Sequence, residues 1–259
     1  MPKTALPFTY TEKGLNCFLK SFPQNFGMVK PAKLTKKEES ELCLACGECC
    51  KRYWITVLPE EATKIARVLN KPKKDFLEND CILQVKLFPK STPGVLTFPS
   101  TFFPKRIFEL LKKNGAGNQQ SFFVVPQVVL KREEKTVFNF IEKRTKTEKR
   151  NACLFLSPEN MCAIYEARPE PCKLFPFIAM PGLREQYPFC ALFQQTNKNL
   201  SVESKIYYQK IQTYFRKIDN FGFDFVWRSP PKKGVLFLNE TQIGEIALDE
   251  LKLMMPKNN

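Results

Sequence analysis

Four of the ten cysteines in this 259-residue chain lie within eight residues, Cys43-Leu-Ala-Cys46-Gly47-Glu-Cys49-Cys50, and the chain contains no histidine. A Cys-x2-Cys step allows two thiolates to converge on one ion from a tight turn, and Gly47 relieves backbone crowding there. Ligand sets made only of thiolates suit zinc, iron–sulfur clusters and copper(I). Because no imidazole is available, mixed cysteine–histidine zinc fingers and Ser-His-Asp or Cys-His catalysis are excluded.

A second block of cysteines follows after a long interval and consists of Cys153, Cys162, Cys172 and Cys190. Since residues 51–152 separate the two blocks, a single site would have to be assembled by the fold rather than by a local finger. Cys-x2-Cys-x2-Cys is also the spacing with which ferredoxin loops present three cysteines to a [4Fe–4S] cluster, a remote cysteine being the fourth ligand. We therefore expect an iron–sulfur cluster, most readily 4Fe–4S, with zinc as the alternative.

The adjacent pair Cys49 and Cys50 leaves the number of metal centres open. Neighbouring side chains diverge, so one of the two either faces a second site or bonds to a different iron of the same cluster. Cys17 and Cys81 lie outside both blocks and are expected to be buried as small hydrophobic residues. Four cations lie beside cysteines and could stabilise thiolates or an anionic cluster: Lys51, Arg52, Arg168 and Lys173.

The hydrophobic pattern predicts the α+β class, as one compact domain of short strands and helices around a cysteine-ligated site, with C-terminal helices. Pro59-Glu60-Glu61 predicts the start of a helix that runs to about residue 70, because proline suits the first helical position and acids complement the helix dipole. Further helices are expected over 71–81, 106–113, 201–219 and 241–254, the last with Asn239 as N-cap. Strands are expected at 53–57, 82–99, 153–156 and 234–238, and a hairpin is expected to join 122–132 to 136–141 through a turn at 133–135. Short helical turns interrupted by prolines are expected over 162–176.

Three regions are predicted along the chain: an extended, proline-interrupted arm at 1–41, a cysteine-cluster metal-binding domain at 42–195, and a C-terminal helical extension at 196–259 packed on the same domain. The first twenty residues lack the apolar stretch of a secretory signal, and no run approaches the roughly 18–20 apolar residues of a membrane span. We therefore expect a cytoplasmic protein. In a reducing cytosol, clustered cysteines are more often metal-binding or catalytic than disulfide-bonded.

The formal net charge of +15 favours polyanionic partners, either an acidic protein or a nucleic acid. The densest basic runs lie at 30–37, 71–74 and 131–150, and the last of these also contains glutamates. Solvated faces of mixed charge are therefore the competing interpretation of these runs.

The octet at 43–50, followed by Cys153-Leu-Phe-Leu, Cys162-Ala-Ile-Tyr-Glu-Ala-Arg-Pro and Pro-Cys172-Lys173-Leu-Phe-Pro-Phe, resembles the YkgJ-type cysteine-cluster family, a zinc- or iron-chelating domain with a CxxCxxCC signature. The resemblance covers the two ends of the region 43–190. It implies a metal site built from Cys43, Cys46, Cys49, Cys50, Cys153, Cys162 and Cys172, with Cys190 added by its position after the Phe-Pro-Phe stretch. The chain departs from the family in its N-terminal arm, in the long insert between the blocks, and at Lys173, where the family often has arginine.

Three functional hypotheses stay open at this point. The first is a metal-binding protein whose thiolate site is structural or carries electrons. The second is a protein-modifying enzyme that uses the site, since the same signature appears in flagellin lysine N-methylases. The third is a basic nucleic-acid-binding protein in which zinc holds the fold.

Overall fold

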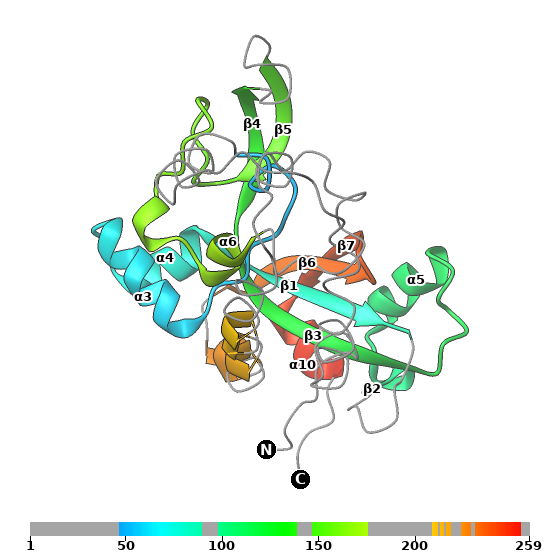
Figure 1. Ribbon diagram of the computed structural model, residues 1–259. Coiled ribbons are helices and arrows are strands. Elements are labelled where there is room, and N and C mark those ends of the chain that lie inside the picture. Colours follow the sequence, from blue (N-terminus) through cyan, green and yellow to red (C-terminus); the bar gives the residue numbers. More distant parts are fainter. Residues whose placement is uncertain are drawn as a thin grey trace.

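A five-stranded mixed sheet and a separate two-stranded ribbon organise the protein (Figure 1). The computed structural model describes residues 47–89, 98–138, 147–175, 209–211, 213–214, 216–218, 224–228 and 231–254. The sheet has the order β2-β3-β1-β6-β7, in which β1 is antiparallel to β3 and parallel to β6. Its strands are β1 (Cys81–Phe88), β2 (Phe98–Pro99), β3 (Ser121–Leu130), β6 (Lys233–Leu238) and β7 (Thr241–Ala247).

The central strand β1 is held by apolar burial on its core face and by a close approach to β6. Leu83, Val85 and Leu87 alternate along β1 and are at most 1% exposed, as period-2 patterning requires. Leu83 lies opposite Gly234 of β6. A Cβ atom at Gly234 would lie 1.8 Å from the Leu83 carbonyl oxygen, so a larger residue cannot occupy this position without moving the strands. The strands predicted at 82–99 and 234–238 are thus confirmed, with β1 and β2 occupying the ends of the first range.

Strand β3 continues almost directly into β4 (Arg132–Phe138), which pairs with β5 (Thr147–Cys153) as an antiparallel ribbon standing away from the sheet (Figure 1). The predicted hairpin between 122–132 and 136–141 is therefore wrong. Residues 133–135 lie inside β4, and they contain none of the glycine or asparagine residues that favour a tight turn. The strand predicted at 153–156 is also misplaced, because Cys153 ends β5 and only Leu156 forms an isolated bridge, with Cys162.

Two helices lie next to the start of β1 and follow the sequence prediction closely. Helix α3 (Pro59–Val68) has its proline at the first positions, and the carboxylate of Glu61 accepts the Leu58 backbone N–H at 2.8 Å. Helix α4 (Lys73–Asn79) follows it. The segment 53–57, predicted as a strand, forms one isolated bridge, between Thr56 and Val129 of β3.

The other described helical elements are short. Helix α5 (Lys105–Lys113) ends at Asn114-Gly115 as predicted, where Gly115 has a φ of +77°. Helical turns η2 (Ser100–Phe102), η3 (Tyr165–Ala167) and α6 (Glu170–Leu174) are also present, and the last two confirm the turns expected over 162–176. Within the described part of the chain, no helix is long and apolar enough to cross a membrane.

The C-terminal part of the chain contributes strands as well as helices. The helix predicted over 201–219 is confirmed at its described positions, 209–211, 213–214 and 216–218. The helix predicted over 241–254 is wrong in its first half, since β7 precedes helix α10 (Leu248–Met254). Asn239, with a φ of +53°, opens the two-residue turn between β6 and β7 and is not an N-cap.

Sheets and helices mixed in this way are compatible with the α+β class, although the parallel β1–β6 pair was not foreseen. The C-terminal region contributes β6 and β7 to this sheet besides its described helical positions. Both predicted domain boundaries, and the arm at 1–41, lie outside the described residues.

Candidate metal centre

The first cysteine block ends in a turn that packs against the loop after β5. Gly47 has a φ of +65°, and a Cβ atom there would lie 3.0 Å from both Asn160 and Leu156. The turn is closed by backbone hydrogen bonds from Lys51 to Gly47 (3.2 Å) and from Tyr53 to Cys49 (3.0 Å). A glycine at position 47 is therefore required both by the left-handed backbone and by the close approach of the loop.

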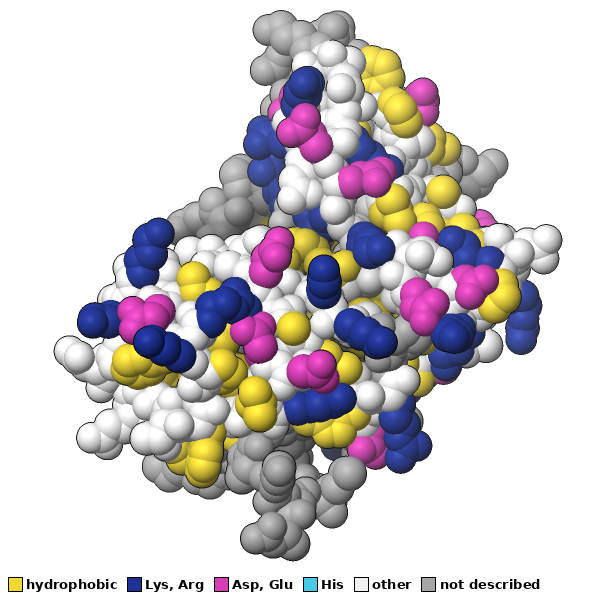
Figure 2. Space-filling view, turned by 180° about the vertical axis from the view of Figure 1, so that it is seen from behind, with side chains coloured by type: hydrophobic (Ala, Val, Ile, Leu, Met, Phe, Trp, Pro, Cys, Tyr) yellow, Lys and Arg dark blue, Asp and Glu magenta, His cyan; other side chains and the backbone are white. Residues whose placement is uncertain are grey.

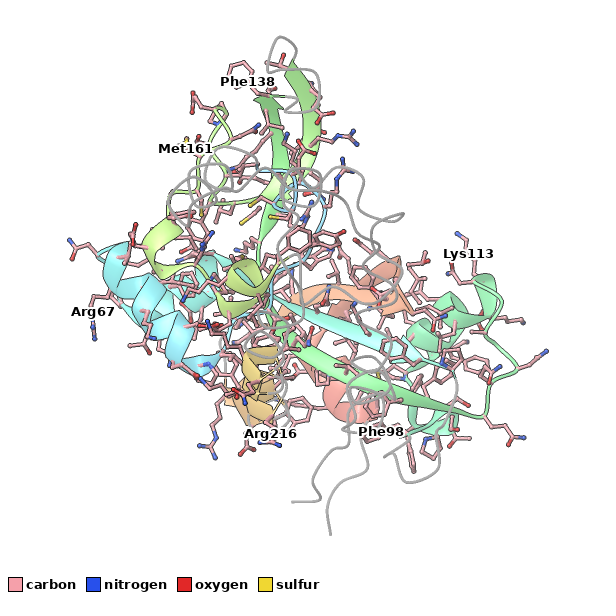
Figure 3. All side chains as sticks on the ribbon, in the orientation of Figure 1. Arg67, Phe98, Lys113, Phe138, Met161 and Arg216 are labelled. Atoms are coloured by element: carbon pink, nitrogen blue, oxygen red, sulfur yellow. The ribbon has the colours of Figure 1, made fainter. Side chains whose placement is uncertain are left out.

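The two cysteine blocks meet at a backbone hydrogen bond. The N–H of Cys153, at the end of β5, donates to the carbonyl oxygen of Cys50 at 2.9 Å. Cys162 follows in the loop bridged to Leu156, and Cys172 lies in α6, where its N–H donates to Pro169 at 3.0 Å. In Figure 3, sulfur atoms gather below the ribbon, between it and α6. The fold has thus brought together residues from both blocks, as the spacing argument required.

The pKa values of these thiols depend on one another; by solvent exposure Cys153 is buried and the other four are partly buried. A hydrogen bond from the Cys50 thiol lowers the pKa of Cys49, and the same bond together with burial raises the pKa of Cys50 well above its ordinary value. Burial raises the pKa of Cys153 to about 11. Burial also raises the pKa values of Cys162 and Cys172, and negative charge on Cys49 raises both further. Each thiolate that forms therefore makes the next one harder to form.

The described residues do not by themselves complete a metal site. Among them, no group of three or more cysteine or carboxylate side chains is arranged to hold an ion. Three of the eight predicted ligands, Cys43, Cys46 and Cys190, lie outside the described residues. The full ligand set therefore stays a prediction. The other five cysteines, Cys49, Cys50, Cys153, Cys162 and Cys172, are free thiols.

Of the two cysteines outside the blocks, Cys81 is described and Cys17 is not. Cys81 begins β1, is 1% exposed and belongs to the hydrophobic core. Burial raises its pKa far above the ordinary thiol value. The prediction of a small buried hydrophobic residue is confirmed for Cys81.

Of the four cations predicted to stabilise thiolates, Arg168 lowers the pKa values of three thiols. Arg168 stacks 4.1 Å from the Tyr165 ring, and its positive charge lowers the pKa values of Cys49, Cys162 and Cys172. The other three cations instead lie on carboxylates: Lys51 at 2.7 Å and Arg52 at 3.2 Å from Glu48, and Lys173 at 3.4 Å from Glu170.

Sequence reasoning missed Arg132, the first residue of β4. Its guanidinium donates to the backbone carbonyl oxygens of four residues, which are Cys50, Lys51, Tyr53 and Asn151. Arg132 lies opposite Cys153 in the ribbon. Nothing in its local sequence marks this role, because it depends on the register between β4 and β5.

Several described cations of the basic run 131–150 lie in the ribbon close to acids. Lys135 lies 3.0 Å from Glu133, and Arg150 lies 2.9 Å from Glu148. On the face shown in Figure 2, lysine and arginine side chains are interspersed with acidic ones. These contacts favour the interpretation as a face of mixed charge, and a polyanionic partner stays a prediction.

Comparison with known proteins found one family. The family model named CxxCxxCC, described as "Putative zinc- or iron-chelating domain", matches residues 124–203. The match begins within β3 and includes Cys153, Cys162, Cys172 and Cys190, whereas the octet at 43–50 lies before it. The resemblance to this family is confirmed over that range. Searches of curated proteins and of solved structures gave no match, so the likeness to flagellin lysine N-methylases has no relative to support it.

Proposed function

We propose that this protein binds metal through thiolates of both cysteine blocks. The match of residues 124–203 to a zinc- or iron-chelating domain supports metal binding. We further propose that the bound group is an iron–sulfur cluster rather than zinc. The observation that carries the proposal is the junction of the blocks, where the Cys153 N–H donates to the Cys50 carbonyl at 2.9 Å. Two segments that are far apart in sequence, and that both contain cysteines, are in contact there.

The donor chemistry of the described residues fits such a group. Five free thiols gather there, and burial together with mutual repulsion raises the pKa values of most of them. Raised pKa values favour the protonated thiols when no cation is bound, whereas a bound soft metal replaces the protons and offsets the repulsion. The positive charges of Arg132 and Arg168 lie beside them and complement an anionic set of thiolates.

The same interactions favour one shared centre over two separate ones. The charge of Cys49 affects Cys162 and Cys172, and Cys50 is affected by Cys153 and Cys172. A pair of independent sites would divide the thiols into two groups with little influence on each other. A polynuclear cluster can accept Cys49 and Cys50 on different metal atoms.

In this proposal the residues of the chain have distinct tasks. The turn at 47–50 supplies Cys49 and Cys50, the end of β5 supplies Cys153, and α6 adds Cys172. Arg168, stacked on Tyr165, keeps a positive charge near three of the thiols. A bound iron–sulfur cluster would supply one-electron transfer.

The test is metal analysis of protein purified without oxygen. We expect a brown protein with absorption near ~400 nm and about four iron and four sulfide per chain, as expected for a [4Fe–4S] cluster. A colourless protein with one or two zinc ions would refute the cluster and retain metal binding. Protein without metal would refute the proposal as a whole.

Matched variants identify the ligands. Cys153→Ser and Cys172→Ser should abolish metal loading because each removes a soft ligand. Cys81→Ala is the control, since Cys81 is also a free thiol but belongs to the hydrophobic core at the start of β1. Full loading of either serine variant, or loss of metal in the Cys81 variant, would show that the ligand set is wrong.

A further inference from the structure

The guanidinium of Arg132 ties three segments of the chain together at the junction of the cysteine blocks. It donates to the carbonyl oxygens of Cys50 at 3.3 Å and of Lys51 at 2.7 Å, and also to those of Tyr53 and Asn151. Four of its five N–H groups are used in this way. The bonds connect β4 both to the segment after the first block and to β5.

One acceptor of Arg132, the Cys50 carbonyl oxygen, also accepts the hydrogen bond that joins the two cysteine blocks. The Cys50 carbonyl oxygen accepts the Cys153 N–H at 2.9 Å and Arg132 Nη1 at 3.3 Å. Arg132 and Cys153 are direct partners in the register of β4 and β5. The position of Cys50 relative to Cys153 is therefore determined by two donors on one oxygen.

The charge of Arg132 is not neutralised by a carboxylate within the described residues. The ion pairs of the neighbouring cations use Glu48, Glu133 and Glu148, and none of the described pairs involves Arg132. The guanidinium also lies over the Trp54 ring, 5.5 Å from its centroid. Among the described residues this half-buried cation donates to neutral carbonyls, and its charge interacts with Cys50 and Cys153.

We infer that Arg132 is a positioning residue for the metal centre: its planar fork holds Cys50 against Cys153, and its charge complements the thiolates. This inference rests on the proposed metal-binding function. Lysine cannot replace the fork, because an ammonium is a single point donor and cannot reach four carbonyls in fixed directions.

The experiment uses the full chain, with Arg132→Gln and Arg132→Lys as variants. Arg106→Gln is the matched control, since Arg106 also makes several bonds, to Glu250 and the Glu245 carbonyl, far from the cysteines. Metal-free protein is titrated with Co²⁺ against a competing chelator, and the thiolate-to-Co²⁺ absorption is recorded. We expect a loss of 10–100-fold in affinity for Arg132→Gln, the range for residues that support metal ligands. Arg132→Lys should bind more weakly than wild type with a shifted spectrum.

A second readout does not depend on metal. Alkylation rates of individual thiols in the metal-free protein are measured by mass spectrometry. Arg132→Lys keeps the positive charge and loses the fork, so it should raise the rates at Cys50 and Cys153 about tenfold or more, as expected for the loss of a hydrogen bond to a charged group, and should leave Cys81 unchanged. If the rate at Cys81 rises equally, Arg132 supports the whole fold and the inference is wrong.

The outcomes separate the inference from the proposed function. Wild-type affinity and spectrum in both Arg132 variants would overturn the inference and leave metal binding intact. If the wild-type protein binds none of Co²⁺, zinc and iron, the proposed function is wrong. The alkylation rates would still decide whether Arg132 holds Cys50 against Cys153. If Arg132→Gln does not fold, wild-type behaviour of Arg132→Lys is sufficient to refute the need for the fork.

Discussion

A buried ion pair directly flanks the adjacent cysteines, and its removal gives a sharp test of the fold around them. Lys51 Nζ lies 2.7 Å from Glu48, and both side chains are only 2% exposed. Lys51 Nζ also donates to the Phe138 carbonyl at 2.5 Å. Glu48 has a second partner in Arg52 at 3.2 Å, which is 35% exposed. The pair joins the cysteine turn to the end of β4.

Lys51→Met keeps most of the side-chain volume and removes the charge, which leaves Glu48 buried. Breaking a buried pair in this way costs about 3–5 kcal/mol. Because Arg52 still donates to Glu48, and Asn160 still donates to the Phe138 carbonyl at 2.9 Å, we expect about 3 kcal/mol, the low end of that range. For a chain of this size this corresponds to a fall of roughly 6–12 °C in Tm.

The assay is denaturant unfolding of metal-free protein, with the double variant Glu48→Gln, Lys51→Met as the matched control. The double variant carries no uncompensated buried charge, so it should be more stable than Lys51→Met alone. A loss below about 1 kcal/mol in Lys51→Met would refute the reasoning, since it would place that variant among ordinary surface substitutions. A double variant as unstable as the sum of its single variants would show that the two residues are not coupled.

Two further predictions concern the frame that holds the site. Burial raises the pKa of Glu61 above its ordinary value of 4.5, so its contribution to stability is present below that pH and is lost as the pH rises through the folded-state pKa. Glu61→Gln should lack this loss, so the unfolding free energy of wild type minus that of the variant should fall as the pH rises. A difference that does not change with pH would contradict the burial argument. Gly234→Ala should lose more than about 3 kcal/mol in denaturant unfolding, because its Cβ atom would meet the Leu83 backbone, whereas Gly115→Ala, with open space but a φ of +77°, should lose only about 1 kcal/mol. Equal losses in the two glycine variants would mean that β1 and β6 can separate freely at this point.

Helices with local start and stop signals were predictable from the sequence. Pro59 and the two glutamates after it identify the start of α3, and Asn114-Gly115 identifies the end of α5. These signals act within a few residues, because they satisfy backbone groups or set a local φ. They therefore do not depend on the rest of the fold.

Strand pairing was not predictable in the same way. Ile243 and Ile246 are three residues apart, a spacing that fits a helical stripe, and Asn239 suits both an N-cap and a turn. In the structure the segment pairs with β6, and Asn239 forms the turn. Local pattern could not decide between these alternatives, because the decision depends on hydrogen bonds to another strand.

At the candidate site, too, some features were predictable from the sequence and others depended on strand pairing. The spacing of the cysteines predicted that the two blocks meet, and the contact between Cys50 and Cys153 confirms it for the described part of the site. The role of Arg132 could not be read from the sequence, since it follows from the register that places it opposite Cys153. Which cations act on the thiols also required the structure, because Lys51 and Arg52 lie next to a buried carboxylate instead.

The octet lies before the matched range 124–203, yet the structure ties its end to that range by backbone bonds. Val57 donates to the Val128 carbonyl, and Leu130 donates to the Ile55 carbonyl, each at 2.9 Å. Residues 55–57 therefore pair with the end of β3 like a short added strand. Backbone pairing of this kind fixes register without requiring particular side chains, so the long insert between the blocks does not prevent the first block from reaching the second. A particular residue type is needed at only a few positions of this junction, chiefly Gly47 and Arg132.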